Sequence, residues 1–144
     1  MRISTLLTSK GTAVATIRPE ASVADAVAEL AAHGIGALVV STDGSHIDGI
    51  VSERDVVRAL NGDDGSMLQD RVSSIMSSTV HTASPEDDTD SLMATMTDRR
   101  IRHVPIVDES GALAGIVSIG DVVKTRIGEL EKDRKELVDY INAR

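Results

Sequence analysis

Apolar positions along the chain change their spacing in a fixed order. In residues 22–33 apolar side chains recur at helical spacing, after Ser22, which can cap a helix, and before Gly34, which can end one. A short apolar run follows at Ala37–Ser41, and a polar turn separates it from a second run that ends at Ser52. The pattern predicts a helix followed by a β-hairpin.

The same order of elements occurs a second time. Residues 14–58 align without a gap over residues 80–124, at an offset of 66, with thirteen identical positions. Seven of these fall in one block, Gly-Ile-Val-Ser-x-x-Asp-Val-Val, which begins at Gly49 and again at Gly115. A short strand near Val14, and its counterpart near Val80, completes a predicted β-α-β-β-α unit in each half.

An internal repeat says more about the architecture than any single predicted helix or strand does. We therefore predict an α/β (α+β) fold of two tandem β-α-β-β-α repeats, packed face to face about a pseudo-twofold axis. The predicted division is repeat 1 at 1–62, a linker at 63–70, repeat 2 at 71–126 and a C-terminal helical extension at 127–144. Upstream, Arg2–Leu7 resembles Arg71–Met76 at an offset of 69, so the first copy carries about three extra residues around Ser9–Gly11.

The last predicted helix is longer than its counterpart in the first half. Its apolar side chains follow a heptad-like stripe: Val123, Ile127, Leu130, Leu137 and Ile141. The stripe either packs on its own domain or forms a contact with a second copy or a partner, and it is too short to establish a coiled coil.

Composition excludes several classes of function. A net charge of −8 argues against binding duplex nucleic acid, and Tyr140, as the single aromatic residue, leaves no stacking platform for single strands. The chain has no cysteine, and no apolar run is long enough to span a membrane. No signal peptide is recognisable, so we expect a cytoplasmic protein.

The duplicated Ser-x-x-Asp has two interpretations. Ser followed three residues later by an acid is a capping box, which satisfies free N–H groups at a helix start. The same helix start offers N–H groups and a positive dipole end to a phosphate, and the Asp can accept hydrogen bonds from a ribose diol. Because the arrangement occurs twice after a predicted strand, we favour ligand binding in addition to capping.

Charged runs elsewhere are less specific. Arg99–His103 is the one dense basic run; Arg99 and Arg100 suit a helix end, whereas Arg102 and His103 lead into an apolar strand and should face a cleft or a partner. We interpret the acidic residues 86–90 as dipole-compensating rather than metal-binding, and His33, His46 and His81 as surface or structural. No nucleophile-base set is visible, so we expect no catalysis.

At this point each half resembles a CBS domain, and the pair resembles a Bateman module of the small stand-alone bacterial kind. The resemblance covers residues 1 to about 126 and rests on the two Gly-Ile-Val-Ser-x-x-Asp blocks together with Ile-Arg-His-Val-Pro-Ile-Val at residues 101–107. It implies two clefts between the halves that bind adenosyl ligands: AMP, ADP or ATP, with NAD or S-adenosylmethionine as further possibilities. It also implies a homodimer.

Carried over residue by residue, the resemblance implies two sites. One would use Ser52, Arg54 and Asp55 against Ser77, Ser78, Ile101 and Pro105. The other would use Ser118, Gly120 and Asp121 against Thr12, Ile35, Gly36 and Ala37. Arg102 and His103 match the family's basic pair near the phosphates and could serve either site. Gly36 and Ala37 stand opposite that pair in the alignment, so we expect two sites of unequal affinity.

The resulting hypothesis is a non-catalytic adenine-nucleotide sensor that signals to an unknown effector protein. The alternative is a nucleotide-independent dimerisation or interaction module that acts through its C-terminal helix. The sequence does not discriminate among the adenosyl ligands.

Overall fold

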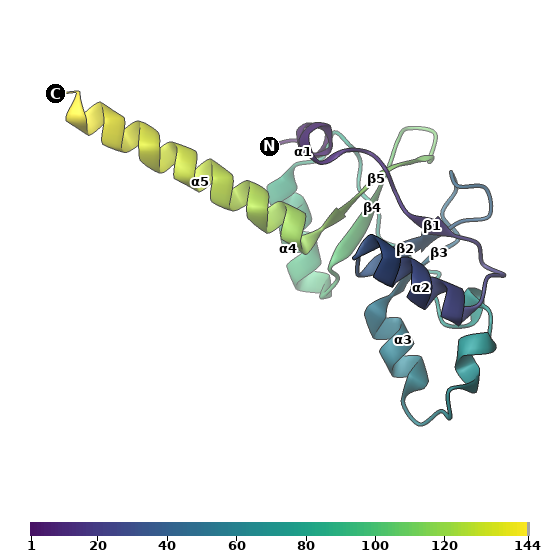
Figure 1. Ribbon diagram of the computed structural model, residues 1–144. Helices are drawn as coiled ribbons and strands as arrows, with labels where there is room; N and C mark the ends of the chain where they lie inside the picture. Colours follow the sequence, from purple (N-terminus) through teal and green to yellow (C-terminus); the bar gives the residue numbers. More distant parts are fainter. Residues whose placement is uncertain (144) are drawn as a thin grey trace.

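We describe the chain over residues 1–143 from a computed structural model (Figure 1). In chain order the elements are α1 Ile3–Lys10, β1 Thr16–Ile17, α2 Val23–His33, β2 Ala37–Val40, β3 Gly49–Ser52, α3 Glu53–Leu60, the 3₁₀ helices η1 Ser66–Gln69 and η2 Val72–Ser74, α4 Thr89–Arg99, β4 His103–Val107, β5 Leu113–Ser118 and α5 Ile119–Asn142. The order β-α-β-β-α is complete in the first half, as predicted.

Each half builds its own small sheet around the predicted hairpin. β2 is antiparallel to β3, with Ala37 opposite Ser52, and β4 is antiparallel to β5, with His103 opposite Ser118. β1 adds to the first sheet, parallel to β2. The equivalent registers confirm that the duplicated block occupies the same place in both hairpins.

The predicted short strand near Val80 is reduced to a single bridge between Ala83 and Ile106. In the first half, the Val39 N–H donates to the Ala15 carbonyl at 3.3 Å. Pro105 occupies the aligned position in β4 and has no N–H to donate, so the matching ladder bond cannot form. The proline therefore explains why the second sheet lacks a strand equivalent to β1 within the described residues.

Three helices begin with the same capping arrangement. Ser22, Ser52 and Ser118 each accept a hydrogen bond from the backbone N–H three residues later, and the Asp at that position accepts one in return. α2 ends at Gly34 in the left-handed conformation, as predicted. α4 starts after Asp88, whose side chain makes no cap hydrogen bond.

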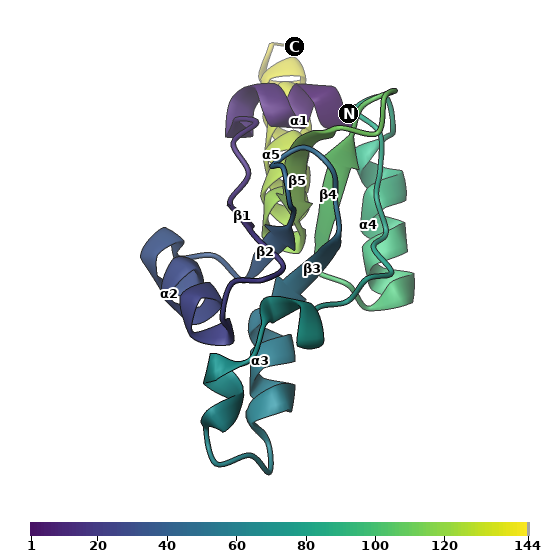
Figure 2. The same cartoon turned by 90° about the vertical axis from the view of Figure 1, so that its right-hand side faces the viewer.

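The two hydrophobic cores are completed by exchanged segments. Val72, at the start of the second repeat, is buried in the core of the first repeat, where the Val72 N–H donates to the Ala21 carbonyl at 2.7 Å. Reciprocally, α1 is buried in the core of the second repeat through Ile3, Leu6 and Leu7. Figures 1 and 2 both place α1 beside β5 rather than over the first sheet.

Glycines permit these exchanged contacts. A Cβ on Gly49 would lie 2.6 Å from the Met76 sulfur and 2.8 Å from the Ser77 carbonyl oxygen. A Cβ on Gly115 would lie 2.8 Å from a Leu7 methyl group. Glycine is thus required at these two identical positions of the repeat, because another segment packs directly on the strand.

The acidic run at 86–90 has a role that we did not predict. Glu86 accepts a hydrogen bond from Arg2 at 2.9 Å, and the Ile3 N–H donates to the Asp87 carbonyl at 2.8 Å. The run therefore helps to dock the start of α1. Among the described residues, no group of three or more His, Asp or Glu side chains is arranged to hold a metal ion.

Residues 63–70, which we predicted as a linker, contain the 3₁₀ helix η1. Met67 in this helix is only 4% exposed, and the Asp70 carbonyl accepts a hydrogen bond from the Val23 N–H at 2.9 Å. The segment is thus packed against the start of α2.

Helix α5 leaves the body of the molecule after its first turns (Figure 1). Val122 is buried, but the predicted stripe is not: Ile127 and Leu130 are each 52% exposed and Ile141 is 65% exposed. The interpretation in which the stripe packs on its own domain is therefore wrong. Within residues 1–143, no helix has both the length and the hydropathy needed to cross a bilayer.

Candidate adenosyl-ligand cleft

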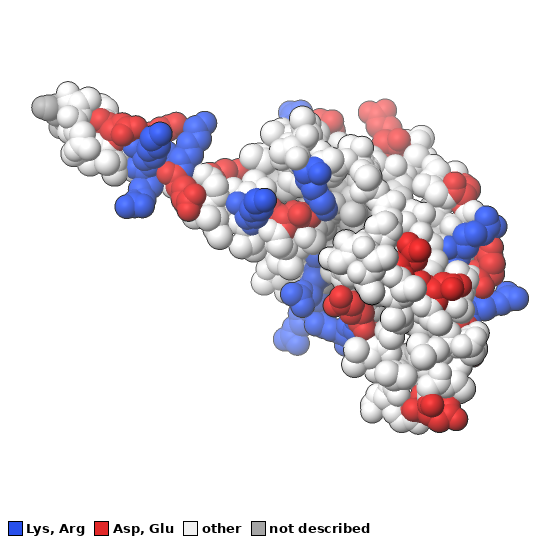
Figure 3. Space-filling view, viewed as in Figure 1, with Lys and Arg blue, Asp and Glu red and all other residues white. Residues whose placement is uncertain are grey.

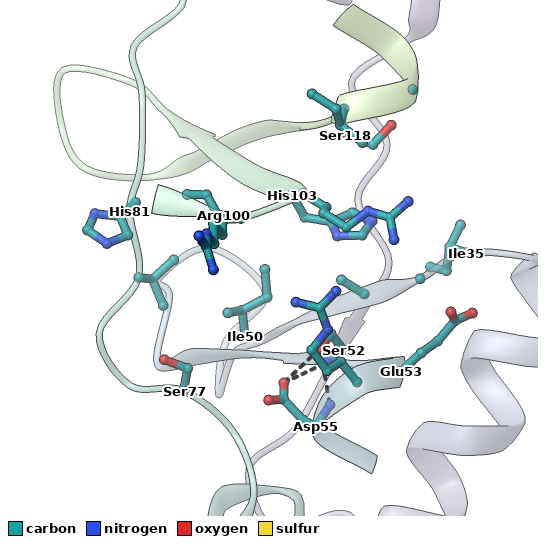
Figure 4. A pocket seen from close by; sticks show the side chains of 18 of the residues that line it. Ile35, Ile50, Ser52, Glu53, Asp55, Ser77, His81, Arg100, His103 and Ser118 are labelled. Atoms are coloured by element: carbon teal, nitrogen blue, oxygen red, sulfur yellow. Dashed lines mark hydrogen bonds between the residues drawn. The ribbon is translucent and has the colours of Figure 1, made fainter. Parts of the chain in front are cut away.

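A cavity of about 510 Å³ lies between the two halves. It is bounded by the start of α3, the end of α2 with the start of β2, the segment 77–81, and the starts of β4 and α5. Figure 4 shows Ser52 and Asp55 on one side of it and His103 and Ser118 on the other. Its volume is in the range of cavities that hold small organic ligands.

Each duplicated junction sets its hydroxyl and carboxylate by the same local geometry. The Ser52 N–H donates to Asp55 Oδ2 at 2.8 Å and the Asp55 N–H donates to Ser52 Oγ at 3.3 Å. At the second junction, the Ser118 N–H donates to Asp121 Oδ2 at 2.8 Å and the Asp121 N–H donates to Ser118 Oγ at 3.2 Å. Capping is thus realised at both junctions, and it orients both carboxylates.

The cavity is basic although the chain is acidic. Four arginines line it, against the carboxylates of Glu53 and Asp55: Arg54, Arg58, Arg100 and Arg102. Figure 3 shows basic side chains gathered between α4 and α3. Such a local excess of positive charge attracts anionic ligands.

The lining residues that the sequence analysis did not assign to the site include Arg58, His81 and Arg100. Arg100 has a φ of 55°, in the left-handed region that its counterpart Gly34 adopts more readily. The available signal was an arginine aligned with a helix-ending glycine. A side chain is disfavoured at a left-handed position, so an arginine there indicates a role for its side chain. His81 lies 3.4 Å from Arg99 and lines the cavity instead of standing alone.

His103 is one of the residues by which the second half lines the cavity. Its ring is 3.2 Å from where a Cβ on Gly36 would be, so the small residue of the first half makes room for the histidine of the second. Burial, followed by the nearby charges of Arg102 and Lys10, lowers the pKa of His103, while Glu53 and Asp121 act in the opposite direction. The unliganded environment of His103 therefore favours the neutral imidazole.

The structure brings most of the predicted site residues together in this one cavity. Those that line it are Ser52, Arg54, Asp55, Ser77, Ile101, Arg102, His103, Ile35, Gly36, Ala37, Ser118 and Gly120. Four others lie outside its lining: Thr12 and Ser78 are exposed, Pro105 is buried within β4, and Asp121 is half-buried behind the helix start. Residues of both predicted sites therefore line the same cavity, with Asp55 among them and Asp121 outside it.

Lys10, which the sequence did not indicate, contacts the second junction. Its ammonium donates to Asp121 Oδ2 at 2.5 Å and to the Ile116 carbonyl at 2.5 Å. Burial alone would raise the pKa of Asp121, but the hydrogen bonds from Lys10 and from Ser118 outweigh it and leave the pKa lowered. The carboxylate is thus ionised and paired.

Comparison with known proteins identifies the two halves. The CBS domain family model matches residues 10–62 and 72–128. A CBS-domain-containing protein from Agrobacterium tumefaciens is 46% identical and superimposes with a TM-score of 0.83, over 88% of this chain and 99% of that one. A CBS domain protein from Pyrobaculum aerophilum, solved in complex with AMP, is 29% identical with a TM-score of 0.74, over 84% of this chain and 89% of that one.

A mitochondrial CBS domain-containing protein of Arabidopsis thaliana is 37% identical over 124 residues, which make up 83% of this chain and 60% of that protein. The chain thus spans less than two thirds of the plant relative. The matched segments are the two halves that the internal repeat defines, and they include both Ser-x-x-Asp junctions. The chain therefore belongs to the CBS domain family and carries two CBS domains in tandem.

Proposed function

We propose that this chain is a non-catalytic sensor of an adenosyl ligand, bound in the cavity between the two CBS domains. The observation that carries the proposal is the basic cavity into which both Ser-led helix starts open. AMP bound to the Pyrobaculum aerophilum relative supports the same ligand class.

The lining matches the parts of a nucleotide. Asp55 would accept hydrogen bonds from the ribose hydroxyls, since its Oδ1 atom accepts none within the described part of the chain. Arg54, Arg102 and protonated His103 would face the phosphate. The adenine would lie between aliphatic side chains such as Ile35, Ile50 and Ile101, all of which line the cavity.

The regulatory output follows from where the cavity lies. A ligand that contacts both halves stabilises the arrangements of the halves in which both sets of contacts form. The free energy by which the ligand shifts this equilibrium cannot exceed the difference in its binding free energy between the arrangements. An effector protein or a second copy of the chain would respond to the shift.

Thermal denaturation with a panel of AMP, ADP, ATP, NAD and S-adenosylmethionine tests this proposal. A ligand that binds only the folded state raises the melting temperature with its concentration. In calorimetry with the stabilising compound, we expect Asp55→Ala to weaken binding about 10- to 150-fold, because hydrogen bonds to a charged group are lost. Asp98→Ala, on the exposed side of α4, is the matched control. The proposal is wrong if no compound stabilises the protein.

A second candidate function is an interaction module that acts through α5 and needs no nucleotide. The exposed apolar side chains of that helix favour it, because they have no partner surface on their own domain among the described residues. The two candidates differ in whether a ligand changes the melting temperature.

A further inference from the structure

The two junctions are equal in sequence but not in what covers them. Asp55 lines the cavity, whereas Asp121 does not, although Ser118 and Gly120 beside it do. Lys10 Nζ lies 2.5 Å from Asp121 Oδ2, and no cation within the described residues is paired with Asp55. One carboxylate is therefore open to a ligand and the other is covered by an ammonium group.

Lys10 donates to acceptors at the second junction whose counterparts at the first junction have other donors. There, the Ser52 hydroxyl donates to Asp55 Oδ2 at 3.0 Å and the Ser77 N–H donates to the Ile50 carbonyl at 2.9 Å. At the second junction, Lys10 donates both to Asp121 Oδ2 and to the carbonyl of Ile116, the counterpart of Ile50.

The extra residues of the first copy place Lys10 at this point. Leu7 packs on Gly115 of β5, and Lys10 is three residues further along α1, so both side chains project from the same face of the helix. Gly11 then ends the helix with a φ of 104°, a conformation that disfavours a side chain. The second copy has no counterpart of these three residues.

We propose that Lys10 determines which of the two junctions takes an adenosyl ligand first, by occupying the ribose-binding carboxylate of the second. This inference rests on the proposed function. A ribose must compete with the ammonium paired with Asp121, whereas within the described residues no cation is paired with Asp55. The ligand therefore binds at Asp55 with higher affinity, and the Asp121 junction fills only at higher concentration.

Calorimetry with AMP and with S-adenosylmethionine tests the inference in an Asp55→Ala background, which leaves only the second junction. We expect Lys10→Met to raise the affinity of that junction at least about 10-fold, since a charge-assisted hydrogen bond no longer competes with the ligand. Lys10→Arg keeps the cation and should leave the affinity low. Lys132→Met, in the projecting part of α5, is the matched control, and circular dichroism checks that each variant is folded.

The outcomes are distinguishable. An unchanged or lower affinity in Lys10→Met overturns the role of Lys10 while leaving the sensor intact, and a lower affinity would make Lys10 a ligand contact. Two equal sites in the unmodified chain overturn it as well. If neither the unmodified chain nor Lys10→Met binds either compound, the proposed function itself is wrong.

Discussion

At the scale of single residues, His103 is the cavity group whose charge a ligand would change. Its lowered pKa means that, just below pH 6.5, the unfolded chain binds more protons at this position than the folded chain does. His103 therefore reduces the stability of the unliganded protein as the pH falls from that value toward its folded pKa.

A phosphate near His103 would reverse this preference, because it favours the imidazolium. We predict that AMP binding takes up a proton and that affinity rises as the pH falls from about 7.5 to about 5.5. Calorimetry in buffers of different ionisation enthalpy measures the uptake. His103→Gln should abolish this component, whereas His33→Gln, on the exposed end of α2, should retain it. Equal pH dependence of the affinity in unmodified and His103→Gln proteins would contradict the prediction. The pH dependence would then come from the titration of the phosphate itself.

At the scale of elements, α5 has two parts with different roles. Its first turn carries the capped junction and the buried Val122, whereas its distal part carries exposed apolar side chains. Charged side chains of both signs cover the middle of the projecting helix (Figure 3). Capping and the first contacts with the domain determine where α5 begins, and we infer that a partner covers the exposed apolar side chains of its distal part.

We predict that this partner is a second copy of the chain. Leu137 and Ile141 are 64% and 65% exposed, so replacing both with Glu should leave the melting temperature of the monomer nearly unchanged, as is usual for surface positions. Sedimentation should show that a dimer formed by the unmodified chain becomes a monomer. Lys132→Glu with Lys135→Glu adds carboxylates to the same helix away from the stripe and serves as the control. A monomeric unmodified chain at high concentration would rule out this role.

At the scale of the whole molecule, the exchanged segments make each domain depend on residues outside its own repeat. The core of the first repeat includes Val72, and Ile75 and Met76 pack against it. A cut at residue 62 therefore removes part of that core and leaves α1 without the second repeat that buries it.

We predict that a fragment of residues 11–78 folds more stably than a fragment of residues 1–62. The first contains every residue of one core, and the second lacks Val72 and exposes Leu6 and Leu7. Urea unfolding monitored by circular dichroism compares the two, and a cooperative transition is expected only for 11–78. If 1–62 unfolds as cooperatively as 11–78, the exchanged segment contributes little to the core.

Local patterns were sufficient to predict helices α2, α3, α4 and α5, the two hairpins and the capped junctions, whereas α1 and the two 3₁₀ helices were not predicted. Helical spacing between a capping serine and a glycine depends on neighbours within a few residues, which is why α2 was predicted with its observed ends. The duplication extended this to the pairing of the halves, because similar sequences form similar units that bury corresponding faces.

Only the tertiary structure revealed the contacts between segments that are far apart in sequence. Three such contacts are the docking of α1 on the second repeat, the entry of Arg100 and His81 into the cavity, and the pairing of Lys10 with Asp121. Hydrophobic periodicity predicts none of them, because it depends only on neighbouring residues. The sequence determined that a hydroxyl and a carboxylate stand at two helix starts, since capping is a local interaction. Which of the two carboxylates remains open was decided by packing, because the side chain that covers Asp121 reaches it from 111 positions away.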